Sequence, residues 1–220
     1  MARIARLVVP GYPHHVTQRG ARKLKTFFSD SDYKMYIDLL AKGCKKAGVE
    51  VWAYCLMPNH AHLVAVPERR DSLACLFRQA HRAYTLAINV REGWQGHLWQ
   101  ERFHSFVMDE NYLLATVRYV ELNPVRAGLC SKPEDWTWSS YAAHYCGKND
   151  KLVAVEPMLR RIHQWREFVR SDDQDAERFE ILRSRSRTGR PAGSEAFIDK
   201  LERATGRCLR RRKPGPKKIS

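Results

Sequence analysis

The chain has 220 residues, of which 44% are hydrophobic, so it can form one domain of ordinary size plus an appendage. Its 39 lysines and arginines against 24 aspartates and glutamates give a net charge of +15, which indicates an anionic partner, most often nucleic acid and sometimes an anionic membrane. The sequence has no apolar stretch near the roughly 18–20 residues of a membrane span, no evident signal peptide and no C-x-x-C pair, which predicts a cytoplasmic protein without a zinc ribbon.

The first predicted elements are a strand and a helix. Residues 11–18 alternate weakly between apolar and polar side chains, as in a strand. Asp30 or Ser31 can cap a helix whose apolar residues recur at helical spacing, and Gly48 fits its C-terminal stop. Residues 49–56 are rich in strand formers and predict the second strand.

A hairpin with two histidines follows. Pro58 and Asn59 form a tight turn, and residues 60–66 return as an antiparallel strand with apolar residues on both faces, which predicts an interior position. His60 and His62 are two residues apart, so both imidazoles point to one face. Because imidazole is the commonest protein metal ligand, the pair predicts half of a metal site.

The later elements complete a recognisable order. Asp71 or Ser72 opens a second long helix, residues 102–108 form a further strand, and Asp109 caps the next helix. Residues 133–144 predict one short helix with two exposed or half-buried tryptophans. The order strand, helix, strand, strand, helix, strand, helix predicts a ferredoxin-like α+β layout with an antiparallel sheet.

The C-terminal part is strongly basic. Residues 178–220 contain fourteen arginines or lysines and four acidic residues, so they contribute +10 of the net charge. Residues 195–204 predict one short helix, whereas the last charged stretch is too rich in proline and glycine to pack. We therefore expect a domain over residues 1–145, a helical extension or linker over 146–177 and a partly disordered basic tail over 178–220.

The helix after Asp109 carries the second part of the predicted site. Tyr119 and Asn123 lie one turn apart, about 100° from the apolar stripe, so their side chains can meet at one point. Glu121 projects away from Tyr119 and is left out of the site. Asn123 precedes Pro124, which disfavours helical backbone, so we expect Asn123 at the helix end, where it can bend toward a metal.

These residues predict phosphodiester chemistry. His60, His62 and Asn123 would hold a divalent cation that offsets charge in the transition state, and Tyr119 would attack phosphorus. A phosphotyrosine keeps the phosphoester bond, so the strand can be rejoined to another hydroxyl without external energy, as in a strand transferase. Each residue also has a structural interpretation, because core histidines, packed tyrosines and turn asparagines are common. The joint occurrence with a charge of +15 favours the functional one.

Several segments together resemble a known family, the single-tyrosine HUH transposases, and within it the REP-associated tyrosine transposases. These segments are HVTQRG at 15–20, MPNHAHLV at 57–64, RYVELNPVRAGL at 118–129 and WSSY at 138–141, with residues 189–194 of the tail also similar. The resemblance spans roughly residues 5–145. It implies an RRM-like fold that acts on single-stranded DNA near imperfect, REP-like hairpins, and hence an association with the nucleoid.

The resemblance also implies roles for individual residues. His60 and His62 match the HUH histidines, Tyr119 the nucleophile and Asn123 the third metal ligand, and the products are a 5′-phosphotyrosine and a free 3′-OH. The implied cation is Mg²⁺ or Mn²⁺. Because Mg²⁺ prefers oxygen ligands, phosphate oxygens and water would complete a loosely held ion. Insertion-sequence relatives act as dimers; we expect a monomer here, with a homodimer as the alternative.

Cationic side chains are expected to follow the DNA backbone, as in other single-strand binders. The predicted DNA-binding residues are Arg19, Arg22, Lys23, Lys25, Arg102, Arg126, Arg190, Arg210, Arg211, Arg212, Lys213, Lys217 and Lys218. Arg126 has the alternative of pinning the helix C-terminus, and the tail could clamp the DNA or fold over the site and restrain it. His15 and His104 are assigned structural roles, with a place in the site as the alternative for His15.

Three other functions compete with a transposase. A domesticated DNA- or RNA-binding protein would have no need to retain His60, His62, Tyr119 and Asn123 together. A relaxase or replication initiator of the same chemistry would be expected to carry further domains, such as a helicase. A zinc hydrolase would need a third imidazole, carboxylate or thiolate ligand, and no further motif supplies an obvious one.

Overall fold

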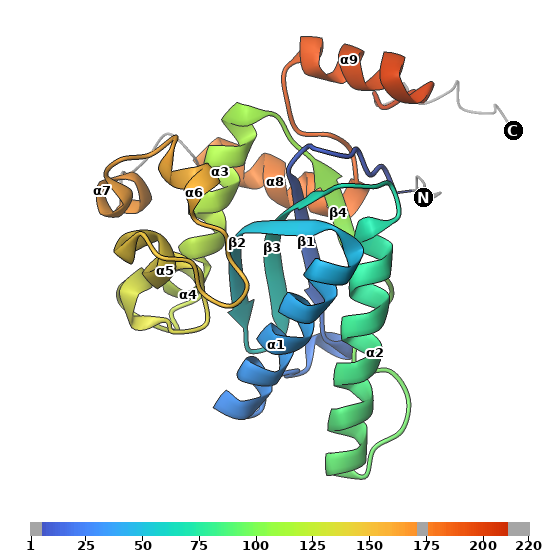
Figure 1. The fold of residues 1–220 in the computed structure, drawn as a ribbon, viewed down its shortest axis with the longest axis vertical. Helices are drawn as coiled ribbons and strands as arrows, with labels where there is room; N and C mark the ends of the chain where they lie inside the picture. Colours follow the sequence, from blue (N-terminus) through green and yellow to red (C-terminus); the bar gives the residue numbers. More distant parts are fainter. Residues whose placement is uncertain (1–5, 171–175, 211–220) are drawn as a thin grey trace, which may run out of the picture.

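The computed structural model describes residues 6–170 and 176–210, which form an antiparallel sheet with helices on both faces (Figure 1). The four strands are β1 (His14–Arg19), β2 (Val49–Met57), β3 (His60–Pro67) and β4 (His104–Val107), in the order β2-β3-β1-β4. The α+β class and the interior position of the histidine-bearing strand are therefore confirmed. No helix among the described residues is long and apolar enough to cross a membrane.

Two long helices cover one face of the sheet (Figure 1). They are α1 (Asp30–Ala47) and α2 (Ser72–Glu92), and they pack against each other over a core that includes Tyr36 and Tyr84. The α1 N-cap is Ser29, one residue before the expected cap, and its backbone N–H donates to the Asp32 carboxylate at 3.1 Å. Gly48 ends α1 at φ 62°, in the left-handed region that glycine adopts without strain, as expected.

The opposite face is covered by α3 (Glu110–Glu121), the helix that carries Tyr119. Its cap is Asp109, whose side chain accepts a hydrogen bond from the Tyr112 backbone N–H at 3.1 Å, as predicted. The apolar stripe of α3 is fully buried against the sheet and comprises Leu113, Val117 and Val120. A short helix, α4 (Asn123–Arg126), follows directly.

The prediction of one helix over residues 133–144 is wrong. The segment contains a 3-10 turn, η2 (Pro133–Asp135), then a non-helical stretch with a turn at residues 137–138, and only then α5 (Tyr141–Cys146). The non-helical stretch lies beside the edge strand β2, where Leu56 N–H donates to the Trp138 carbonyl at 2.8 Å and Cys55 pairs with Ser139. An edge strand exposes backbone groups that need partners, and pairing with them overrides local helix preference. Both tryptophans of this stretch are half-buried, as expected.

The C-terminal region contributes more structure than the sequence indicated. After α6 (Glu156–Leu159) and α7 (Trp165–Arg170) come α8 (Ala176–Thr188) and α9 (Glu195–Thr205). The helix α9 matches the short helix expected there. The helix α8, which begins in the expected extension and continues into the basic tail, packs against α3, β4 and β1. The helix α8 therefore lies with α3, which carries Tyr119, whereas α9 lies beyond the end of the sheet (Figure 1).

Candidate active site

A cavity of about 470 Å³ lies between β1, β3, α3 and α8, and it contains the histidine pair and the tyrosine. It is lined by Thr17, Gln18, Arg19, Lys23, His60, His62, Gln100, His104, Tyr119, Arg183, Ser186 and Arg187. The two rings of His60 and His62 are 4.9 Å apart between centroids, and the Tyr119 ring is 5.7 Å from His62. The strand period has placed both imidazoles on one face, as the sequence predicted.

Each imidazole of the pair has a side-chain partner at Nδ1. His60 Nδ1 lies 2.6 Å from Asn59 Oδ1, and His62 Nδ1 lies 2.9 Å from His15 Nε2. Among the described residues, His62 Nε2 and His15 Nδ1 are buried without a hydrogen-bond partner. A buried polar atom without a partner is costly, so a ring nitrogen in that state suits a site that a cation completes. His15, which was assigned a structural role, therefore belongs to this cluster.

The three histidines are neutral at physiological pH. Burial, with a smaller effect of Arg19, lowers the pKa of His60 to about 4, and burial lowers the pKa of His15 to about 3. The pKa of His62 is lowered well below 6.5 by burial and by the neighbouring His60, His15 and Arg19. A neutral imidazole keeps the lone pair that a metal ion requires, so the pair is ready to bind a cation without losing protons first.

Tyr119 is half-buried beneath α8. Its ring contacts Phe179 of α8 at 5.3 Å between centroids, and the Arg126 guanidinium lies 5.3 Å from the Tyr119 ring and 4.5 Å from the Phe179 ring. Burial, and then the neighbouring Arg183, lower the pKa of Arg126. Arg126 thus contacts the candidate nucleophile directly, whichever of its two expected roles it has.

Asn123 does not line the cavity. It begins α4, immediately before Pro124, and its side-chain nitrogen is buried without a hydrogen-bond partner among the described residues. Among residues 6–170 and 176–210, no group of three histidines, cysteines, aspartates or glutamates is arranged to hold a metal. Two neutral imidazoles and one carboxamide are therefore the donor set to consider, and the amide is compatible with a hard cation through its oxygen.

Glu121, which helical angles left out of the site, has a structural environment instead. It is fully buried, and its carboxylate accepts hydrogen bonds from Ser140 Oγ at 2.7 Å and Trp165 Nε1 at 2.9 Å. His144 Nδ1 lies 2.7 Å from the same carboxylate. This network joins α3 to α5 and α7, on the side away from the cavity.

The predicted DNA-binding residues divide by location. Arg19 and Lys23 line the cavity, and Arg22 and Lys25 are exposed beside it on the loop after β1. Both Arg22 and Lys23 have positive φ, at 54° and 63°, an uncommon backbone for non-glycine residues that is often found at functional sites. This loop therefore presents its cations at the edge of the cavity.

The other predicted cations lie elsewhere. Arg190 donates to the Leu209 carbonyl at 2.8 Å, and Arg210 forms ion pairs with three carboxylates of α9. Residues 211–220 lie outside the described part of the chain, and they include Arg211, Arg212, Lys213, Lys217 and Lys218. The structure thus does not bring Arg190 or Arg210 to the cavity.

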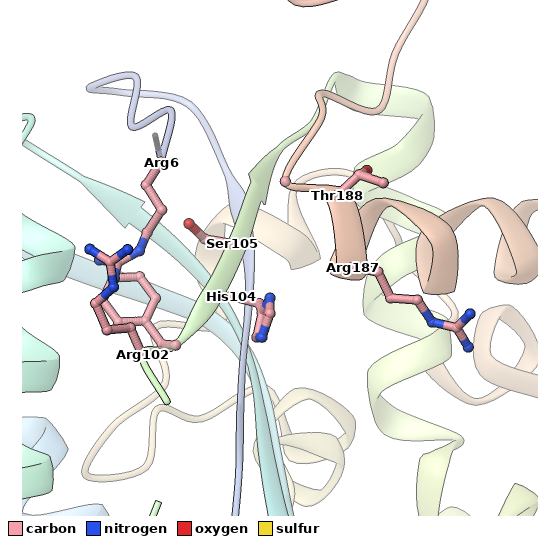
Figure 2. Close-up of a pocket in the computed structure, with 8 residues that line it drawn as sticks. Arg6, Arg102, His104, Ser105, Arg187 and Thr188 are labelled. Carbon is pink, nitrogen blue, oxygen red and sulfur yellow. The ribbon is translucent and has the colours of Figure 1, made fainter. Parts of the chain in front are cut away.

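Arg102 lines a smaller pocket at the edge strand β4 (Figure 2). Figure 2 shows Ser105 and His104 pointing to opposite sides of β4, as neighbours on a strand do. Arg6 and Arg102 lie on the Ser105 side, whereas Arg187 lies on the His104 side, which belongs to the main cavity. Arg102 therefore does not line the main cavity, although its pocket shares His104 and Arg187 with that cavity.

Sequence analysis missed the contribution of α8. Arg183 and Arg187 line the cavity with Ser186, although residues 178–220 were read as a tail. The available signal was the four-residue spacing of these two arginines, which places them on one helix face. Gln100, just before β4, lines the cavity too and carries no sequence motif that marks it.

Comparison with known proteins places this geometry in a family. The chain belongs to the IS200-like transposases, since residues 10–123 match the family described as "Transposase IS200 like". A REP-associated tyrosine transposase of Escherichia coli (strain K12) is 25% identical over 112 residues, which are 50% of this chain and 66% of that protein. A similarly named protein of Haemophilus influenzae is 27% identical over 109 residues, 44% of this chain and 62% of that protein. The chain thus spans a little under two thirds of each relative.

One solved structure supports the fold. A REP-associated tyrosine transposase bound to a REP hairpin superposes with a TM-score of 0.58 at 22% identity, covering 70% of this chain and 92% of that one. The likeness extends beyond the region that matches the family and confirms the overall arrangement of sheet and helices.

Proposed function

We propose that this IS200-like transposase is a metal-dependent single-stranded DNA strand transferase that works through a 5′-phosphotyrosine on Tyr119. The observation that carries the proposal is the meeting of His60, His62 and Tyr119 in one cavity lined by arginines. These residues come from a strand and a distant helix, and a purely structural core would have no reason to combine two neutral imidazoles, a tyrosine and several cations.

The proposed cation ligands are His60, His62 and Asn123, with Mg²⁺ or Mn²⁺ as the ion. Once bound, such an ion would polarise the phosphodiester and offset the charge that develops on it. The neutral imidazoles support this assignment, and Asn123 would contribute its carboxamide oxygen. Arg19, Arg183 and the rest of the cationic lining would hold the DNA phosphates in place.

In the proposed reaction, Tyr119 is the nucleophile. Its hydroxyl oxygen attacks phosphorus, the bond from phosphorus to the 3′-oxygen breaks, and one strand leaves with a free 3′-OH. The 5′-phosphate stays on the tyrosine as an ester, so attack by another 3′-OH reverses the step and rejoins a strand. Hairpin-containing single strands are the proposed substrate, because a relative of the same fold was solved bound to a REP hairpin. We propose that the protein acts as a monomer.

The test is an adduct assay. Labelled single-stranded hairpin oligonucleotides are incubated with the protein and Mg²⁺ or Mn²⁺, and a denaturant-resistant protein–DNA adduct is measured. Wild type is expected to form the adduct and Tyr119→Phe to form none, because the phenol oxygen is the only atom removed. Tyr112→Phe, on the same helix but outside the cavity lining, is the matched control and should form the adduct at the wild-type rate.

Each outcome decides something. An adduct that persists in Tyr119→Phe would show that another residue is the nucleophile. If wild type and variant bind the hairpin equally and neither forms an adduct, a non-catalytic nucleic-acid-binding protein becomes the better account. A duplex of the same sequence in the same gel tests the preference for single strands.

A further inference from the structure

We propose that Asn59 and His15 are positioning residues that set the tautomers of His60 and His62, and thereby the affinity of the pair for a divalent cation. The inference rests on the proposed function, since it takes His60 and His62 as the cation ligands. It concerns two side chains that the sequence analysis assigned to a turn and to a structural role, with the site as an alternative for His15.

Asn59 fixes His60 in one tautomer. The Asn59 carboxamide has one accepting and one donating end, and Nδ2 donates to the Lys23 carbonyl at 2.9 Å. The amide is thereby oriented, and Oδ1, which can only accept, faces His60 Nδ1 at 2.6 Å. His60 must then carry its proton on Nδ1, which leaves Nε2 with the lone pair that coordinates a metal.

His15 leaves His62 with two arrangements. The contact between His15 Nε2 and His62 Nδ1 is 2.9 Å long and buried, and an imidazole nitrogen can either donate or accept. If His62 donates, its Nε2 has a lone pair for a cation. If His15 donates, His62 carries its proton on Nε2, and that nitrogen cannot coordinate.

The two arrangements are closely balanced without a ligand. When His62 donates, His15 Nδ1–H is the buried donor without a partner, and when His15 donates, that donor is His62 Nε2–H. Each arrangement leaves one such N–H among the described residues, so neither is favoured by hydrogen bonding alone. A cation at His62 Nε2 satisfies that atom in one arrangement only, so binding selects the tautomer in which His62 donates to His15.

The first measurement is Mn²⁺ affinity of the full chain without DNA, from the electron paramagnetic resonance signal of free Mn²⁺. Asn59→Ala and His15→Phe are expected to weaken binding by about tenfold or more, because each removes the group that holds a ligand ring. His15→Gln, which can still accept a hydrogen bond from His62 Nδ1, should bind within about threefold of wild type by the same reasoning. His14→Gln, at the neighbouring buried histidine outside the cavity, is the control and should not change the affinity.

The second measurement is the tautomer itself, from nitrogen-15 NMR of histidine-labelled protein with and without Mg²⁺. We expect His60 with its proton on Nδ1 in both samples, and a shift of His62 to the same form when Mg²⁺ is added. A His60 proton on Nε2, or wild-type Mn²⁺ affinity in His15→Phe, would overturn the positioning roles. A wild-type protein without Mn²⁺ affinity would instead overturn the cation assignment of the proposed function.

Discussion

His14 and His15 are neighbours on β1, both buried, with side chains on opposite faces of the sheet. His14 has both ring nitrogens satisfied, since Nδ1 donates to the Tyr12 carbonyl at 2.8 Å and Nε2 accepts from the Val9 backbone N–H at 3.1 Å. His15 has one partner, His62, and one nitrogen with none among the described residues. The two buried histidines therefore differ in hydrogen bonding. Only His15, which has one ring nitrogen without a partner among the described residues, lies with the candidate site.

The same contrast extends to the tyrosines of the two faces. Under α1 and α2, Tyr84 donates to the Thr26 carbonyl at 2.6 Å, and the Tyr36 hydroxyl lies 2.9 Å from His81. Tyr119, on the other face, is half-buried and lines a cavity among cations. The hydroxyls of Tyr36 and Tyr84 are thus used in packing, whereas Tyr119 faces the cavity, so substitutions at the two sites should have different consequences.

The largest difference is expected between His60→Leu and His14→Leu. His60→Leu should lower the rate of adduct formation roughly 1,000-fold, about 4 kcal/mol of transition-state stabilisation, because a proposed cation ligand is lost. Its free energy of unfolding should change by less than about 1 kcal/mol, since the partner Asn59 can turn to water. His14→Leu should instead leave the adduct rate intact and cost about 1–3 kcal/mol, because it strands two backbone groups.

Adduct assays and urea unfolding of both variants check this pair. Equal loss of activity in the two variants, after correction for the folded fraction, would mean that the two histidines are not functionally distinct. Equal loss of stability would mean that the hydrogen bonds of His14 contribute no more to the free energy of unfolding than those of His60.

Local sequence patterns were enough to predict the helix ends and the strand that carries the two site histidines. The Asp109 cap, the Gly48 stop and the two-residue spacing of His60 and His62 are local rules, and each was confirmed. Sequence patterns could not predict α8 over Tyr119, because its composition is that of a solvated tail and only tertiary contact with α3 gives it a place. The helix prediction for the segment before α5 was wrong for a related reason, because pairing with the β2 edge overrides local helix preference.

The second prediction concerns the pH dependence of folding stability that comes from His14. Burial lowers the pKa of His14 from 6.5 to about 4. Between those values the unfolded chain binds a proton that the folded chain does not, so stability falls as pH falls below 6.5 and is unaffected above it. Lowering the pH from 7 to 5 should cost about 2 kcal/mol through His14 alone.

Urea unfolding of His14→Gln at pH 7 and pH 5 checks this. The variant should lose about 2 kcal/mol less than wild type between the two pH values, whatever its stability at pH 7. An unchanged pH dependence would mean that His14 is protonated in the folded protein and that its two hydrogen bonds do not hold it neutral.

The smallest expected effect compares two arginines of the C-terminal region. Arg183 lines the cavity and pairs with one carboxylate, Glu180, whereas Arg210 pairs with Glu195, Asp199 and Glu202. A cation that contacts a phosphate releases counterions on binding, so Arg183→Ala should reduce the slope of log affinity against log salt by about 0.7 for single-stranded DNA. Arg210→Ala should leave that slope unchanged, because three carboxylates already pair with its guanidinium.

Fluorescence anisotropy of a hairpin oligonucleotide at several salt concentrations measures both slopes. A reduced slope in Arg210→Ala would mean that DNA competes with the three carboxylates for this guanidinium, and the basic C-terminal residues would then belong to the DNA-binding surface as the sequence suggested. An unchanged slope in Arg183→Ala would mean that the phosphates do not enter the cavity beside α8. The DNA would then have to approach Tyr119 from the side of Arg19 and Lys23. In that case the same titration of Lys23→Ala would show the reduced slope.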